Sequence, residues 1–434
     1  MSTQTQIVPA KSAEQQAISA TMSKAARRPA WGLTIGALIA LIAFAIMAPN
    51  TTAVFRLSAN DAPVQVPPLE ASSPLIGWLV AILLIAAAVW AWYLAIVKQR
   101  SIPSWATGLA WVLFLIGLMV WLVGTAKNPN ISLVQLLTGA VALSLPIVFG
   151  SMSGALCERA GVVNIAIEGQ LLLGAFGAAL GGLLTGSIYG ALISAALGGV
   201  FVSALLALFA VKYLVNQIIV GVVLNVFASG LTGFLAGTLL KNGEGFHEMP
   251  KLGKLPIPGL ADIPLLGPIL FQQTILGYAM FLLVPGLWFA LFRTRWGLRV
   301  RAVGEHPKAA DTVGINVNRL RTSNVLIAGV VAGIGGSYYT LVSTSEFTAN
   351  MTGGTGYIAL AALIFGRWNP LLAACAGLLF GFVTNLQYTL AQAGTEVPSQ
   401  FMAMLPYIVT ILAVAGLVGN SRGPAASGEP YVKE

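Results

Sequence analysis

Residues 128–157, NPNISLVQLLTGAVALSLPIVFGSMSGALC, contain no Lys, Arg, Asp or Glu, and the segment CERAGVVNIAIEGQ (157–170) continues from their last residue. A helix crosses a bilayer with roughly 20 apolar residues, so this run is long enough to span a membrane. Other uncharged stretches of comparable length lie at 29–55, 71–97, 101–126, 169–211, 213–240, 263–292, 322–345, 347–366, 368–395 and 397–421. The stretch 169–211 breaks at Thr185-Gly186-Ser187 and holds two spans. The sequence predicts an all-α polytopic membrane protein with about 12 transmembrane helices.

The charges agree with this fold class. Only 23 Lys and Arg and 14 Asp and Glu occur among 434 residues, whereas about a quarter of a soluble domain is charged. With the N-terminus inside, 18 of the 23 basic residues fall on the inside, as the positive-inside rule demands. Both termini are then cytoplasmic. The net charge of +9 follows from the membrane topology and requires no nucleic acid partner, while membrane lipids surround the spans.

Motifs for catalysis are missing from the sequence. A phosphate-binding loop needs G-x-x-x-x-G-K-[ST], but the Gly253-Lys254 pair is followed by Leu255. His247 and His306 lie in no H-E-x-x-H frame. We expect no catalytic residue, no metal site, no cofactor and no enzyme activity in this chain.

The chain divides into an N-terminal group of spans and a core. The predicted divisions are a disordered cytoplasmic tail (1–30), three extra N-terminal transmembrane helices (31–127) with an extended outside loop (50–73), a core (128–420) with a long cytoplasmic connection (293–321), and a cytoplasmic C-terminal tail (421–434).

Two interruptions divide spans within the core. Glycines and charged residues break the chain between Gly150 and Gly177 on the inside, and glycines break it between Gly333 and Gly356 on the outside. The breaks are five spans apart, so the second copy of an odd-numbered repeat would be upside down. Inverted repeats with broken helices mark a midplane binding site in many transporters. We predict inverted repeats with broken or re-entrant helices, since the span near 354–366 is short enough to be re-entrant.

Polar residues within the spans are candidates for a substrate pathway. Asn164 and Glu168 lie four residues apart and would share one helix face. Ionisable groups at membrane depth are costly and are functional by default. Asn225, Tyr338 and Asn385 add amide and aromatic groups, which suit a neutral polyhydroxylated or heteroaromatic solute. The alternative is that these groups form hydrogen bonds between helices, or that Glu168 brackets an interfacial turn.

The cytoplasmic connection carries WGLRVRAVGEHPKAADTVGINVNRLR at 296–321. Pro307 suits the first turn of a helix and Gly314 suits its C-terminal stop, which predicts a short helix over Pro307–Val313. A loop that only supplied positive charge would not need a capped helix. A docking element for a soluble partner would need one.

Four motifs, in this order, resemble the permeases of bacterial ABC importers in the ribose and simple-sugar superfamily, and within it the nucleoside branch. The motifs are LCERAGVVNIAIEGQLLLGAF (156–176), LNVFASG (224–230), RAVGEHPKAADTVGINVNRLR (301–321) and GTGYIALAALIFGRWNP (354–370). The resemblance covers about 131–420, and the three N-terminal spans fall outside it. Residues 128–420 thus resemble an ABC permease core.

The resemblance implies a permease subunit that takes up nucleosides, or a related simple sugar, by ATP-driven alternating access in the bacterial cytoplasmic (inner) membrane. The implied partners are an ATP-binding ABC subunit, a second permease that is identical or paralogous, and an extracytoplasmic solute-binding lipoprotein. Residues implied at the ATPase interface are Glu305, His306, Pro307, Ala309, Ala310, Asp311 and Gly314. Residues implied along the translocation path are Gly161, Asn164, Glu168 and Gly169.

Two other classes of protein stay open on the sequence. An ion-coupled secondary transporter of a neutral polar solute would depend on intramembrane ionisable residues and would work without an ATPase. A non-transporting scaffold would have no polar cavity. A wet pocket near Asn164, Asn225 and Asn385 would exclude the scaffold.

Overall fold

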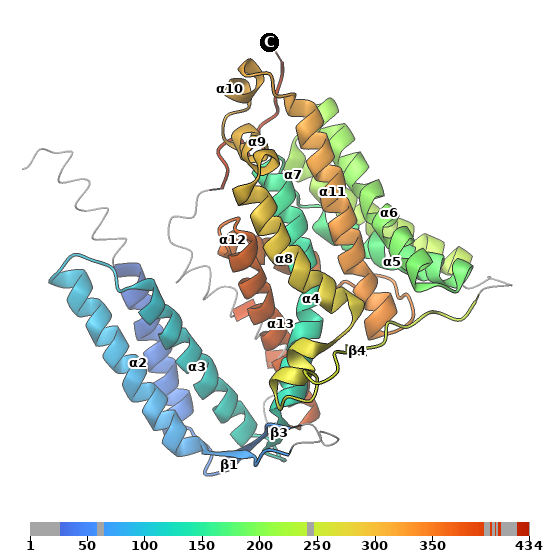
Figure 1. Cartoon of the computed structure of the whole chain (residues 1–434). Helices are drawn as coiled ribbons and strands as arrows, with labels where there is room; N and C mark the ends of the chain where they lie inside the picture. The colour runs from blue at the N-terminus through green and yellow to red at the C-terminus, as the bar shows by residue number, and fades with distance from the viewer. Residues whose placement is uncertain are drawn as a thin grey trace, which may run out of the picture.

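The computed structural model describes residues 27–58, 65–240, 247–394, 400, 401, 404, 407, 408 and 423–433. Ten of the described helices are long and apolar enough to cross a membrane. They are the first helix (Arg27–Ile46), α2 (Ser73–Ile96), α3 (Ser104–Gly124), α4 (Leu133–Arg159), α5 (Ile167–Thr185), α6 (Ile188–Ala207), α7 (Gln217–Leu235), α8 (Ile275–Arg293), α11 (Val317–Tyr338) and α13 (Pro370–Gln392). The chain is an all-α, multi-pass membrane protein (Figure 1).

The observed helices follow the predicted spans closely. The first helix begins at Arg27, inside the predicted tail of 1–30, and residues 1–26 lie outside the described part. A short apolar helix, α12 (Thr355–Phe365), occupies the predicted tenth span. The predicted twelfth span, 400–419, falls mostly outside the described residues.

The first helix, α2 and α3 form an N-terminal unit with its own apolar core. Phe44 of the first helix packs against Phe114 of α3, with ring centroids 5.2 Å apart. Figure 1 shows this unit standing beside the remaining helices. A small sheet joins the unit to α4: β1 (Thr52–Arg56) pairs antiparallel with β2 (Leu69–Ser72) and parallel with β3 (Asn130–Ser132). Within the predicted loop of 50–73, the described strands β1 and β2 are extended and pair with each other.

Glycines let α5, α6 and α11 pack backbone to backbone in the core. A Cβ atom at Gly333 of α11 would lie 2.3 Å from the carbonyl oxygen of Ala195 in α6. A Cβ atom at Gly174 of α5 would lie 2.4 Å from the carbonyl oxygen of Gly333. Small residues drive such close approach in membranes, where the hydrophobic effect between helices is absent.

Two irregular segments interrupt the core helices. Residues 160–166 separate α4 from α5, and residues 344–354 separate α12 from the π-helical end of α11 (Tyr339–Ser343). The helix α12 is only about 16 Å long, too short to span the membrane. Trp368, just before α13, contacts Arg159 at the end of α4, whereas α11 ends at the opposite end of the bundle. The segment 344–365 therefore connects the two ends as an irregular stretch followed by α12.

One end of the bundle carries the connection between α8 and α11, and we call it the basic end. It contains α9 (Arg295–Glu305), α10 (Pro307–Thr312) and the C-terminal residues 423–433 (Figure 1). The helix α10 matches the short helix predicted from Pro307 and Gly314. The sequence analysis did not predict α9, whose Val300 and Val303 are buried while Arg295 and Arg299 are exposed.

A matched pair of glycine substitutions tests the close packing. Gly333→Ala should lower the thermal denaturation midpoint in detergent by several degrees, because overpacking costs about 1–3 kcal/mol. Gly230→Ala in α7, where a Cβ atom meets nothing within 4 Å, should leave the midpoint unchanged or raise it. Equal midpoints for the two variants would contradict the packing described.

Candidate functional site

Glu168, in the first turn of α5, binds the N-terminus of the half-helix α12. Its carboxylate accepts hydrogen bonds from Thr352 Oγ1 at 2.6 Å, Gly354 N at 2.8 Å and Gly356 N at 2.6 Å. The side chain is buried, with 7% of its surface exposed. Glu168 therefore holds together two segments that are far apart in the sequence.

This contact meets a specific need of α12. The first N–H groups of any helix lack partners within the helix and carry partial positive charge. The N-cap of α12 is Gly354, whose φ of +86° is left-handed and which has no side chain to accept these hydrogen bonds. The Glu168 carboxylate supplies the missing acceptor from another helix. In a bilayer interior no water replaces it.

Asn225 of α7 serves the N-terminus of α5 in the same way. Its Oδ1 accepts from Gly169 N at 2.9 Å, and its Nδ2 donates to Ile165 O at 2.9 Å and to Tyr357 Oη at 3.1 Å. The side chain joins α7, α5 and α12. The N-termini of α5 and α12 thus meet within the bundle, where the Glu168 carboxylate caps α12 and the Asn225 amide caps α5. We call α5 and α12 the capped half-helices, because each begins in the interior of the bundle.

The meeting point lies inside the membrane-spanning part. Ile167, the first residue of α5, packs against positions 150 and 154 of α4. Position 150 is nine residues before the end of α4, which is about 13 Å along the helix. From there α5 runs away from the basic end and α12 runs toward it. Opposed half-helices of this kind are what the predicted inverted repeat requires, and the repeat itself stays a prediction.

Asn164 is buried in a polar network near the start of α5. Its Nδ2 donates to Ser153 Oγ at 3.2 Å and to Gln170 Oε1 at 3.0 Å, and Gln170 Nε2 donates to Ser203 Oγ at 2.8 Å. Asn164 lies in the irregular segment 160–166, so the prediction that it shares a helix face with Glu168 is wrong. The helix α5 begins only at Ile167, after Asn164, so Glu168 lies in a helix and Asn164 does not.

Of the remaining predicted pathway residues, Tyr338 lies beside the site, whereas Asn385 joins two helices elsewhere in the bundle. Tyr338 is buried, and its neighbour Tyr339 donates from Oη to Thr355 Oγ1 at 2.7 Å, beside the α12 N-terminus. Asn385 donates from Nδ2 to Leu136 O at 2.7 Å. Residue 136 is about 25 Å along α4 from Ser153, the partner of Asn164. The three asparagines therefore do not share one site, because Asn385 lies near the other end of α4.

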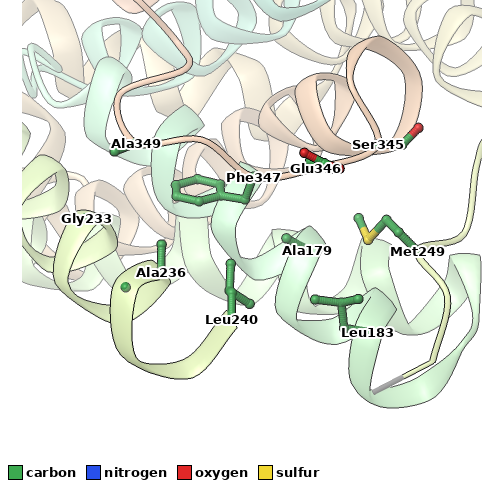
Figure 2. A pocket seen from close by; sticks show the side chains of 11 residues that line it. Ala179, Leu183, Gly233, Ala236, Leu240, Met249, Ser345, Glu346, Phe347 and Ala349 are labelled. Atoms are coloured by element: carbon green, nitrogen blue, oxygen red, sulfur yellow. The ribbon is translucent and has the colours of Figure 1, made fainter. Parts of the chain in front are cut away.

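A cavity of about 590 Å³ opens on the other side of the capped half-helices, away from the basic end. It lies between α5, α7 with its π-helical end, and the segment 345–349. Figure 2 shows Phe347 over the cavity, with Ala179 of α5 and Ala236 of the π-helical end of α7 beneath it. Ser345 and Glu346 bring polar groups to the lining. The sequence analysis did not single out this cavity.

Glu158, at the end of α4, has a structural role. Trp368 Nε1 donates to its carboxylate, and Arg159 Nε donates to Trp368 O at 3.1 Å. Arg367 and Trp368 both have positive φ in the turn between α12 and α13. Glu158 and Arg159 thus stabilise the tight turn between α12 and α13, and this contact is the structural role of Glu158.

The predicted coupling residues lie on and around α10. Glu305, His306, Ala309 and Gly314 are exposed, and Pro307 and Asp311 are partly exposed. Ala310 is 3% exposed and packs in a cluster with Val303 and Val317. Ala310 therefore anchors α10 from beneath, and the other residues form the surface that the basic end presents.

Several residues of the site were missed by the sequence analysis. Thr352 and Tyr357 contact the capping residues Glu168 and Asn225, and Gln170 and Ser203 complete the network around Asn164. Tyr357 stands in the quoted GTGY motif, which was a signal in the sequence. Thr352 and Ser203 carry no local signal, because their roles depend on contacts with distant segments.

Broken helices whose capped N-termini meet inside the membrane, beside a cavity, are typical of membrane transport proteins. Residues 136–414 match the family described as the permease component of the branched-chain amino acid transport system. The guanosine ABC transporter permease protein NupQ of Bacillus subtilis is 39% identical over 318 residues, covering 69% of this chain and 98% of the relative. No solved structure matches the chain.

Two further relatives carry related descriptions. The nucleoside ABC transporter permease protein NupC of Lactococcus lactis is 37% identical over 67% of this chain and 94% of its own length. The putative glucose ABC transporter permease protein TsgC13 of Haloferax volcanii is 32% identical over 69% of this chain and 98% of its own. The chain belongs to the family of ABC transporter permease subunits. The family match begins at residue 136 and leaves the N-terminal unit outside it.

Substituting Glu168 tests the capping arrangement. Glu168→Gln leaves one oxygen for three donors, and hydrogen bonds to charged groups are worth about 1.5–3 kcal/mol each. We expect the thermal denaturation midpoint to fall well below that of wild type. Glu248→Gln, at an exposed position far from α12 in sequence, should match wild type. A Glu168→Gln midpoint equal to both would show that the carboxylate does not hold α12.

Proposed function

We propose that this chain is the membrane-spanning subunit of an ATP-driven importer for nucleosides. The observation that carries the proposal is its likeness to NupQ and NupC, which are described as guanosine and nucleoside permeases and are covered over 98% and 94% of their lengths. The cavity of about 590 Å³ supports it, because ligand pockets for small molecules have volumes of about 300–1,000 Å³. Phe347 offers an aromatic face for a nucleobase.

The likeness to ABC permeases supports the proposed partners, and the charges at the two ends of the bundle support the proposed orientation. The basic end would face the cytoplasm of a bacterial cell, with both termini there, because positive residues gather at cytoplasmic loops. An ABC ATPase would bind around α10 and supply ATP hydrolysis, so this chain needs no cofactor of its own. A second permease, identical or paralogous, would complete the pathway. A solute-binding lipoprotein would deliver the nucleoside at the opposite end.

The structure supports alternating access as the mechanism. The cavity is lined by Ala179 of α5, ten residues beyond Gly169 or about 15 Å along the helix. Glu168, Asn225 and Tyr357 therefore lie between the cavity and the basic end. A solute in the cavity would pass toward the cytoplasm when the two half-helices separate. Movement of α10 by the ATPase would drive that separation, and no covalent chemistry takes place on this chain.

Purification of the tagged chain in mild detergent tests this function directly. We expect an ABC ATPase and a second permease subunit to co-purify in stoichiometric amounts. The complex, reconstituted in proteoliposomes with its solute-binding protein, should take up labelled guanosine only when ATP is enclosed on the side of the ATPase. A lone chain that moves nucleosides under an ion gradient without ATP would contradict the proposal and favour a secondary transporter.

Ala309→Trp tests the site of ATPase docking. Ala309 is exposed on α10, so the substitution should preserve the permease fold while removing the ATPase from the purified complex. Gly108→Trp in α3, where a Cβ atom meets nothing within 4 Å, is the matched control and should retain the ATPase. Full retention of ATPase and uptake by Ala309→Trp would place the docking surface elsewhere.

A further inference from the structure

The C-terminal residues 423–433 are folded against the surface that carries α9 and α10. Ala426 N donates to Gly304 O at 2.9 Å, and Ala425 N donates to Glu305 Oε2 at 3.2 Å. Tyr431 is 7% exposed and packs in the same apolar cluster as Val303 and Ala310. The sequence predicted only a cytoplasmic tail here. The structure places it as a strap, a name we use below for residues 423–433.

Arg321 fixes the strap to the start of α11. Its Nη1 donates to Glu429 O at 2.9 Å, and its Nη2 lies 3.5 Å from Ala426 O. The side chain is 2% exposed. Burial of a guanidinium group is costly unless its donors find acceptors, so the two strap carbonyls stabilise Arg321 as much as Arg321 stabilises the strap.

The strap also touches the irregular segment 160–166. A Cβ atom at Gly161 would lie 2.7 Å from Arg321 Nη2 and 3.3 Å from Ala426 O. A Cβ atom at Gly428 would lie 3.4 Å from Val163. On one side the strap contacts α9 and α10, and on the other it contacts the residues that precede Asn164 and Glu168.

We propose that the strap clamps the α9–α10 pair to the segment 160–166, so that a displacement of α10 reaches the capped half-helices. This inference rests on the proposed importer function, in which a bound ATPase moves α10. The contact path through the strap runs from α10 through Tyr431 and Ala426 to Gly161, and then along the chain to Asn164 and Glu168. It reinforces a direct contact of α9, in which a Cβ atom at Gly304 would lie 2.2 Å from Arg159 O. Arg321 and Tyr431 act as positioning residues, because neither contacts the cavity.

If the strap acts as a clamp, its removal should lower the number of nucleosides taken up per ATP hydrolysed, which we call coupling. The ATPase should stay bound. A chain truncated after residue 422 keeps the exposed face of α10, so it should bind the ATPase and hydrolyse ATP within about twofold of wild type. The number of nucleosides taken up per ATP should fall at least tenfold. Val432→Ala, at a strap position whose side chain is 61% exposed, is the control and should couple normally. A truncated chain that couples as wild type does, or that folds but loses the ATPase, would overturn the clamp.

A second variant keeps the test decisive if truncation prevents folding. Tyr431→Ser removes the apolar anchor from an otherwise full-length chain and should also lower uptake per ATP. Tyr431→Phe keeps the aromatic ring in this cluster and is the matched control, which should couple as wild type does. Coupling by Tyr431→Ser equal to that of Tyr431→Phe would contradict the clamp.

The two proposals fail in different ways. Wild-type complex that takes up no nucleoside with ATP would refute the importer function itself. Wild-type uptake together with unchanged coupling in the strap variants would refute only the clamp. Because contacts alone do not establish coupling between distant sites, uptake per ATP is the quantity to measure.

Discussion

The arrangement of the core depends on one carboxylate that binds the N-terminus of a helix belonging to another part of the chain. Without Glu168, the first N–H groups of α12 would be unsatisfied within the membrane, where each such group costs several kcal/mol. With it, a helix of only 11 residues can begin in the interior of the bundle. Asn225 does the same for α5, so both interruptions of the core are compensated by neighbouring helices.

The close packing of glycines supports this arrangement. Because α5, α6 and α11 approach at backbone distance, the start of α5 is held on a rigid group of helices. The half-helix α12 instead contacts α4, α13 and the first turn of α5. The irregular segment 160–166 lies between these groups and the basic end. Residues 160–166 therefore connect the α9–α10 surface with the capped half-helices.

Much of the fold was predictable from the sequence. Uncharged stretches located the spans because the membrane imposes a length on each helix, and Pro307 with Gly314 located α10 because both residues act locally. The role of Glu168 was not predictable, since its partners Thr352, Gly354 and Gly356 are almost 190 residues away. A four-residue spacing suggested one helix face for Asn164 and Glu168, but α5 begins only at Ile167, after Asn164. The strap was missed because its carbonyl and amide contacts leave no pattern in the sequence.

Hydrogen exchange at the start of α12 tests the central role of Glu168 most directly. The account predicts that the amides of Gly354 and Gly356 are strongly protected in the purified wild-type protein. In Glu168→Gln their exchange should accelerate about 30-fold, since the loss of about 2 kcal/mol of hydrogen bonding changes an opening equilibrium by that factor. Equal exchange rates at these amides in the two proteins would contradict the claim that this carboxylate holds the half-helix in place.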